Sequence, residues 1–267
     1  MRVSKIPVLK IYTTLFFLYI FTPLILIFIF AWNSGEGYVF PLQGFTWNWF
    51  IELFGDDLAK KSIGNSIVIA LSSATISTIL ATFLAIGLLK GGLRKPQLFL
   101  TFLILPVLMP SLTIGISALV FFRTVNIPLG TPIVIIAHIT ISMSYVFLII
   151  MGRIESLPLS LQEASIDLGA SWISSVKDIV FPILLPAVIG GWLFAFMISW
   201  NEFIITYFLI GSGTTLPIYI FSQLRFGISP KVNVISVLVT IFTLAILFML
   251  VLIRNIYKKI VLEQNSV

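Results

Sequence analysis

The sequence predicts an all-α polytopic membrane protein with about six transmembrane helices, and three observations support this fold class. Of the 267 residues, 59% are hydrophobic and 10% are charged, whereas a soluble domain carries roughly 25% charged residues. The mean hydropathy is +1.13. Six apolar runs reach the length of about 20 residues that a helix needs to cross a bilayer. We expect one membrane domain over residues 1–267, with spans at 11–31, 63–89, 98–122, 131–151, 179–210 and 232–253.

The first span follows Arg2, Lys5 and Lys10, a charge pattern that secretory signals share. Its apolar run is longer than the apolar region of about 7–15 residues in a signal peptide, and it lacks a small-x-small cleavage site. We therefore expect an uncleaved membrane anchor.

Residues 32–62 connect the first two spans and contain an amphipathic stretch. It sets four apolar side chains beside three acidic ones: Trp47, Trp49, Phe50 and Leu53 beside Glu52, Asp56 and Asp57. Tryptophan is enriched at the level of the lipid headgroups. We expect a short helix on the membrane surface with no ligand-binding role.

Small residues recur along the second span in two adjacent stripes. They are Ser73, Ser77, Ala81 and Ala85 in one stripe and Ala70, Ala74, Thr78 and Thr82 in the other. Small side chains allow close approach of helix backbones in a membrane. The stripes predict a bundle rather than a particular function.

Two proline pairs interrupt the spans. Pro106 and Pro110 lie in the third span, and Pro182 and Pro186 lie at the start of the fifth. Each removes a backbone donor and clashes with the preceding turn, so we expect kinks or breaks there. Plain kinks and broken helices around a water-filled pathway both fit this pattern. The long fifth span fits either a bent helix or a helix followed by a re-entrant piece.

The distribution of lysine and arginine predicts the orientation. Eleven lie in one set of loops and tails, namely Arg2, Lys5, Lys10, Lys90, Arg94, Lys95, Arg153, Lys177, Arg254, Lys258 and Lys259. The opposite set holds Lys60, Lys61, Arg123, Arg225 and Lys231. Positive residues are enriched in cytoplasmic loops. With six spans, both termini are therefore expected in the cytoplasm.

The predicted cytoplasmic loop 152–178 carries the most specific pattern in the chain. Leu161, Ala164 and Leu168 give a short helix a narrow apolar face. Gly169 follows where a left-handed residue would end that helix. The pattern is too regular for a flexible connector.

A second helix is expected to begin directly after this glycine. Ser171 is placed to cap it, and the helix runs from Trp172 into the fifth span. We call this helix–Gly–helix segment, residues 158–178, the elbow. A push on the elbow could rotate the fifth span.

The elbow resembles the EAA loop of ABC-importer permeases. The family pattern is Glu-Ala-Ala, three residues, Gly, nine residues and Ile-x-Leu-Pro. Its counterparts here are Glu163-Ala164-Ser165, Gly169 and Ile179-Val180-Phe181-Pro182. The spacing is kept, with a serine in place of the second alanine and a phenylalanine in place of the leucine. The six-span layout extends the likeness over the whole chain.

The resemblance implies that the elbow docks in a groove on a cytoplasmic ATPase. It implies that Glu163 pairs with the ATPase, that Ala164 and Ser165 permit close approach, and that Gly169 makes the turn. Leu168 belongs to the same coupling loop. The sequence has no Gly-x4-Gly-Lys-Ser/Thr phosphate loop. We therefore expect this chain to bind no cofactor, with ATP and Mg²⁺ on a pair of separate ATPase subunits.

The resemblance also implies further partners. One six-span chain supplies half of a pathway, so a second permease is expected, with a heterodimer favoured and a homodimer left open. A binding protein outside the membrane would deliver the substrate, and ATP-driven closure would move the elbow and reorient spans three to five. The expected location is the inner membrane of a prokaryotic cell.

Two parts of the sequence favour different substrates. Residues 200–203 (WNEF) are similar to the Trp-Asn-(Glu/Asp)-Phe of many sugar permeases. Residues 163–171 (EASIDLGAS) look like the branch that handles polyamines, opines, phosphonates and iron, and residues 215–238 resemble spermidine/putrescine permeases of the second-subunit type. Because that last stretch is longer, we expect a polyamine, with a sugar or other small solute as the alternative.

Glu202 is the only acidic residue inside a predicted span, and an ionisable group in a membrane is a functional candidate. Its carboxylate could balance an ammonium group. Trp200, Tyr207 and Tyr219 could offer aromatic faces to a cation or to a sugar, and Asn201 completes the candidate pathway. The alternative places Glu202 at the outer interface, solvated or paired with a neighbour.

Nothing in the sequence indicates an enzyme. His138, the single histidine, has no second metal ligand and no catalytic partner, so we expect it to be hydrogen-bonded within the bundle. Zero cysteines leave no thiolate site, and no paired carboxylates are present. We expect no metal site. Dispersed positive charges do not favour nucleic acid.

Two other functional classes are rivals. A stand-alone secondary carrier or channel needs coupling-ion carboxylates or a charged ring within the spans, and only Glu202 is available. A structural membrane protein would not need the spacing of the elbow.

Overall fold

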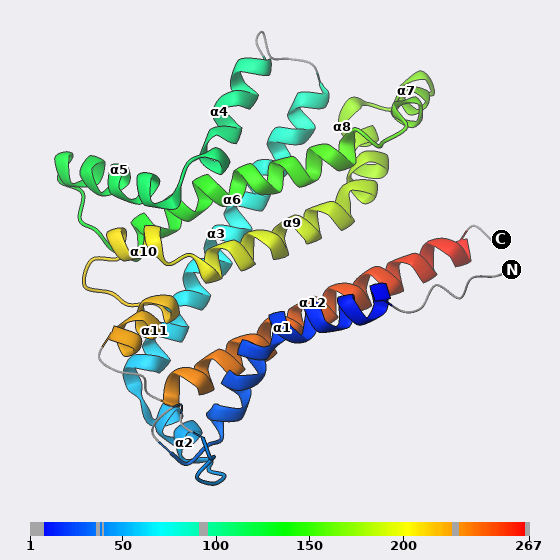
Figure 1. Ribbon diagram of the computed structural model, residues 1–267. Helices are drawn as coiled ribbons and strands as arrows, with labels where there is room; N and C mark the ends of the chain where they lie inside the picture. The colour runs from blue at the N-terminus through cyan, green and yellow to red at the C-terminus, as the bar shows by residue number, and fades with distance from the viewer. Residues whose placement is uncertain (1–7, 36–37, 39, 91–95, 226–229, 265–267) are drawn as a thin grey trace, which may run out of the picture. The chain divides into compact units, whose positions relative to one another are not determined.

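The structure is a computed structural model, and the residues that it describes are 8–35, 38, 40–90, 96–225 and 230–264. These residues form helices (Figure 1). They also form one isolated β-bridge, between Asn33 and Phe45. The chain divides into two compact units, residues 1–60 with 220–267 and residues 61–219. A single domain over 1–267 stays a prediction. Four of the predicted cytoplasmic charges lie outside the described residues: Arg2, Lys5, Arg94 and Lys95.

The first unit contains α1 (Val8–Ala31), α2 (Asn48–Gly55) and α12 (Pro230–Gln264). Both α1 and α2 pack against α12. Helix α2 is the short amphipathic helix expected between the first two spans. It buries Phe50 and Leu53, and the carboxylate of Glu52 lies 2.9 Å from the ammonium of Lys231 on α12.

The second unit holds most of α3 (Asp57–Leu89) and the beginning of α11 (Leu216–Arg225). Between them lie α4 (Pro96–Leu108), α5 (Ser111–Thr124), α6 (Thr131–Ile154), α7 (Leu159–Asp167), α8 (Trp172–Ser175), the π-helix η1 (Val176–Val180), α9 (Phe181–Asn201) and α10 (Ile204–Leu209). Helix α6 is central, because it packs against α4, α9 and α10.

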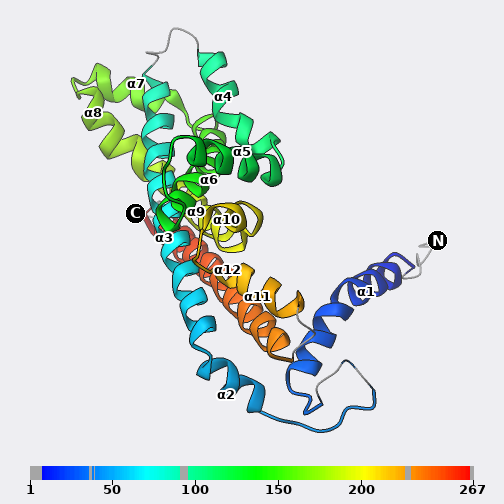
Figure 2. The same ribbon diagram turned by 90° about the vertical axis from the view of Figure 1, so that its left-hand side faces the viewer.

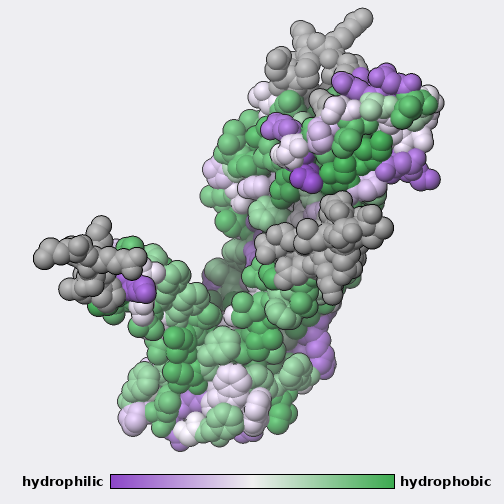
Figure 3. All heavy atoms as spheres, turned by 90° about the vertical axis from the view of Figure 1, so that its right-hand side faces the viewer, coloured by the Kyte–Doolittle hydropathy of each residue, from purple (hydrophilic) through white to green (hydrophobic). Residues whose placement is uncertain are grey.

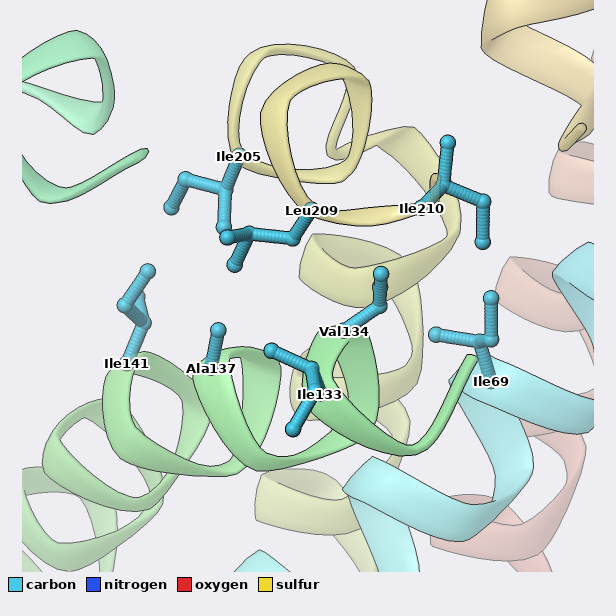
Figure 4. Packing of buried hydrophobic residues seen from close by; sticks show 8 residues of the cluster. All are labelled: Ile69, Ile133, Val134, Ala137, Ile141, Ile205, Leu209 and Ile210. Carbon is cyan, nitrogen blue, oxygen red and sulfur yellow. The ribbon is translucent and has the colours of Figure 1, made fainter. Parts of the chain in front are cut away.

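The core of the second unit forms where α10 meets α6. Figure 4 shows Ile205 and Leu209 of α10 pointing toward Val134, Ala137 and Ile141 of α6. The small-residue stripes of α3 are also buried: the four alanines, Ser73 and Ser77 are fully covered. These small residues therefore lie on a face of α3 that the protein covers.

The expected spans correspond to the observed helices with one qualification. Among the described residues, five helices are long and apolar enough to cross a membrane, or six if the bent pair α4–α5 counts as one span. Large apolar side chains remain exposed along these helices, and they cover most of the face seen in Figure 3. A soluble protein rarely exposes so much contiguous apolar surface, so this surface agrees with a lipid environment.

The two proline pairs act differently. The chain breaks between α4 and α5, where Pro110 directly precedes α5 and the two helices meet at 109°. In contrast, α9 begins at Phe181 and continues through Pro182 and Pro186. The backbone irregularity lies one turn earlier, in η1. Its π-helical hydrogen-bond pattern accommodates the backbone donor that a proline lacks.

Candidate functional site

The long fifth span is a helix followed by a short second helix. Helix α9 ends at Asn201, Glu202 has an extended backbone with ψ of 110°, and α10 starts at Ile204. The break is partly covered, since Glu202 and Phe203 are half-buried, and an interrupted helix is tolerated at membrane depth where protein or a water-filled cavity surrounds it. It places the one acidic residue of the predicted spans at a helix interruption.

The carboxylate of Glu202 connects the two broken spans. Its Oε1 atom accepts a hydrogen bond from the backbone N–H of Ile205 at 3.0 Å. Its Oε2 atom accepts one from the hydroxyl of Ser111 at 3.4 Å, and Ser111 is the first residue of α5 after the break at Pro110. We call Ser111, Glu202 and Ile205 the junction. Glu202 is half-buried, so it is neither fully solvated nor sealed in the core.

A chain of buried polar side chains adjoins the junction. The hydroxyl of Ser199 lies 2.7 Å from Nδ1 of His138 and accepts a hydrogen bond from Ser73 at 2.8 Å. Nε2 of His138 lies 3.0 Å from the hydroxyl of Thr206, which donates to the backbone carbonyl of Glu202. This chain links α3, α6, α9 and α10. The prediction that His138 is hydrogen-bonded within the bundle is confirmed.

The other candidate pathway residues differ in their exposure, and Trp200 lines a small pocket together with Glu202. Trp200 is buried and its ring stacks on Phe196 with centroids 5.9 Å apart. Tyr219 is also buried, whereas Tyr207 is 49% exposed. The amide of Asn201 donates to the carbonyl of Met197. In this conformation, only Tyr207 and Asn201 of these four present an exposed side chain.

Sequence reasoning did not identify three members of this polar group, namely Ser73, Ser199 and Thr206. Serine and threonine are common in membrane helices because they can bond to the carbonyl four residues before, as Ser73 also does. Ser111 of the junction is different, because it directly follows Pro110, where the sequence predicts a kink or break. No group of three possible metal ligands gathers within the described part of the chain.

The elbow has the helix–Gly–helix form that its sequence predicts. Helix α7 ends in a Schellman motif: the N–H of Gly169 bonds to the carbonyl of Ile166 at 2.8 Å, and that of Ala170 to the carbonyl of Ser165 at 3.1 Å. Gly169 has φ of +92°, which side chains other than glycine adopt with strain. Ser171 caps α8 by accepting a bond from the N–H of Ser174.

The two arms of the elbow are held together by serine. The hydroxyl of Ser165 on α7 lies 2.6 Å from that of Ser175 on α8. Ser165 is therefore more than a small residue that permits close approach. From α8 the chain continues through η1 into α9, so the elbow is directly joined to the helix that ends at the junction.

The outer surface of the elbow is apolar and uncovered. Leu168 is 89% exposed and Ile173 is 73% exposed. Glu163 and Ala164 are exposed beside them. Exposed apolar side chains around a charged residue are typical of a surface that a partner covers.

Both loops predicted on the cytoplasmic side lie at the same end of the second unit. The ammonium of Lys90, at the end of α3, lies 5.1 Å from the ring centroid of Trp172 in the elbow. At the other end of α3, the amide of Asn65 donates to the carbonyl of Thr214. Loops that are predicted on opposite sides of the membrane therefore lie at opposite ends of α3.

Comparison with known proteins identifies the family. Residues 77–261 match the model of the binding-protein-dependent transport system inner membrane component. The chain is 32% identical over 229 residues to the spermidine/putrescine transport system permease protein PotC of Haemophilus influenzae, covering 85% of this chain and 89% of that one. It is 33% identical over 231 residues to the putrescine transport system permease protein PotI of Escherichia coli, covering 84% and 82%.

A solved structure with the same fold is that of a bacterial ABC transporter involved in the import of the acidic polysaccharide alginate. Its TM-score is 0.71 at 17% identity, over 91% of this chain and 94% of that one. The fold and the family match both agree with the permease function that the sequence of the elbow predicts. The chain belongs to the family of binding-protein-dependent transport system inner membrane components.

Proposed function

We propose that this permease imports polyamines, spermidine or putrescine. One observation carries the proposal: the likeness to two permeases named for these substrates extends over more than four fifths of this chain. The alginate transporter shares the fold at much lower identity. That likeness does not identify a substrate for this chain. The four residues 200–203 that are similar to sugar permeases keep a sugar as the alternative.

The chemistry of the junction fits a cationic substrate. A half-buried carboxylate strengthens its attraction for an ammonium group, because the local dielectric is lower than in water. The aromatic ring of Tyr207, exposed one turn beyond Glu202, could add a cation–π contact. Trp200 and Tyr219 are buried in this conformation, so their proposed roles require a rearrangement during transport.

The elbow supports a docking role toward an ATPase. Its apolar surface around Leu168 would be covered by a groove on the partner, and Glu163 would supply a charged contact at the edge. ATP and Mg²⁺ would be bound by that partner. The continuous helical path from α8 through η1 to α9 would then carry ATP-driven movement toward the junction.

The remaining partners and the orientation follow from the same proposal. Lys90, Arg153 and Lys177 lie near or within the elbow end of the unit, which favours the cytoplasm for this end. Both termini would then be cytoplasmic. A second permease would complete the pathway, and a binding protein would deliver substrate from outside the membrane.

Uptake of labelled substrate tests the proposal. The chain is expressed with its accompanying transport subunits in cells that lack their own polyamine importers. Labelled putrescine or spermidine should accumulate in an ATP-dependent way, and a labelled sugar should not. Accumulation of a sugar without polyamine uptake would establish the alternative substrate, whereas uptake that persists without any ATPase would contradict the coupling role of the elbow.

A further inference from the structure

An apolar groove of about 570 Å³ runs between α3 and the consecutive helices α8, η1 and α9. Its wall on α3 includes Thr82, Phe83 and Ile86, and its opposite wall includes Trp172 and Phe181. The ends of α3 and α8 lie close together in both ribbon views (Figures 1 and 2). Its volume falls within the range of about 300–1,000 Å³ that is common for sites that hold small molecules. The junction described above is not part of this groove.

Two lysines lie at one end of α3's groove-lining face, one lining the groove and one beside it. Lys177 lines it directly, and Lys90 lies over the ring of Trp172, which also lines it. The nearest acidic side chain in sequence, Asp178, is not among the lining residues and accepts a hydrogen bond from Ser174 instead. The groove therefore has positive charge beside Trp172, and the rest of its lining is mostly apolar.

This combination matches one class of ligand. A molecule that fills an apolar groove and also neutralises two lysines must carry a hydrocarbon chain and an anionic head. Basic pockets between membrane helices on the cytoplasmic side bind anionic lipid headgroups. On the orientation proposed above, the lysines lie at the level of the inner-leaflet headgroups, and the groove extends along α3 toward the membrane centre.

We propose that this groove binds an anionic phospholipid of the inner leaflet, with its headgroup at Lys90 and Lys177 and one acyl chain beside Phe83. The site adjoins the elbow, because Trp172, Ile173 and Lys177 belong to both. A bound lipid would thus contact the segment that receives movement from the ATPase. The inference rests on the proposed orientation but not on the identity of the transported substrate.

Counting the retained lipid tests this site. The full chain is purified with its accompanying subunits in mild detergent, and phosphatidylglycerol and phosphatidylethanolamine are quantified per complex by mass spectrometry. The wild type should retain phosphatidylglycerol above its proportion in the membrane. Lys90→Gln with Lys177→Gln should weaken retention by about fivefold for each charge removed. The matched control, Lys60→Gln with Lys61→Gln at the opposite end of α3, should retain as much as the wild type.

One further variant separates a lipid from a protein occupant. The chain has no cysteine, so Phe83→Cys introduces a single thiol into an exposed position of the groove, and it should not cross-link to another polypeptide.

Three results would overturn the proposal. They are an absence of phosphatidylglycerol enrichment, equal loss in the two double lysine variants, or efficient cross-linking of Phe83→Cys to a neighbouring subunit. A failure to transport polyamines would leave lipid retention unaffected. The two proposals can therefore fail separately.

Discussion

The elbow and the junction belong to the same unit but are held together in different ways. The elbow is built from contacts between residues close in sequence, of which the pair Ser165–Ser175 is ten residues apart. The polar groups beside the junction join residues 61 to 126 positions apart. The elbow can thus keep its shape while it is pushed, whereas the junction depends on the relative positions of several helices and changes when they move.

The strongest test of the elbow is Gly169→Asp, which should reduce uptake to the background level while the protein remains in the membrane. A Cβ atom at this position meets nothing within 4 Å, so no neighbouring atom blocks the new side chain. The left-handed backbone costs a side chain about 1–2 kcal/mol, and the new carboxylate lies on the docking surface. Uptake and the membrane level of the protein are measured together.

Gly169→Asn is the matched control, since asparagine tolerates the left-handed conformation and carries no charge. It should transport better than the aspartate variant. Wild-type uptake by Gly169→Asp would refute the docking role of the elbow.

The strongest test of the junction is Glu202→Gln. Glutamine keeps an oxygen that accepts the N–H of Ile205 and an amide that can pair with Ser111, so the break between α9 and α10 is preserved. Only the charge is lost. Because hydrogen bonds to charged groups contribute about 1.5–3 kcal/mol, uptake of a polyamine should fall by about tenfold or more.

Glu202→Ala separates the two roles of this carboxylate, since it removes the hydrogen bonds as well as the charge. It should lower the membrane level of the protein, and Glu202→Gln should not. Unchanged polyamine uptake in Glu202→Gln would make Glu202 a purely structural residue.

The polar chain beside the junction is tested by Ser199→Ala. This change leaves Nδ1 of His138 without its partner in α9, and a buried unpaired group costs about 1–3 kcal/mol. The thermal unfolding midpoint of the purified protein should fall. Ser142→Ala on α6 is the control, because its hydroxyl is equally buried but has no partner within the described residues. Equal losses in both variants would show that the chain of bonds adds no stability.

The same contrast explains which features the sequence could predict. The Schellman turn at Gly169 and the cap at Ser171 depend on residues within a few positions of each other. The spacing of residues in the sequence was therefore sufficient to predict them. The break at Pro110 follows from the missing N–H of one residue. The pairing of Glu202 with Ser111 requires the packing of α5 on α10, and the covering of Trp200 and Tyr219 depends on the fold around them. No local sequence pattern predicts these contacts, because they join residues that are far apart in the chain.

The smallest expected effect is that of Ser165→Ala, which replaces the serine with the residue of the family pattern. It removes the bond to Ser175 but keeps the size that close docking requires. A hydrogen bond between neutral groups contributes about 0.5–1.5 kcal/mol, and less where water replaces the partner. Ser165 is half-buried, so uptake should stay within about twofold of the wild type.

Ser165→Leu is the informative contrast: it removes the same bond but adds bulk to the docking surface, and it should lose most of its uptake. If the alanine variant loses as much as the leucine variant, the two arms of the elbow depend on the serine pair, and the elbow is less self-supporting than its local caps indicate.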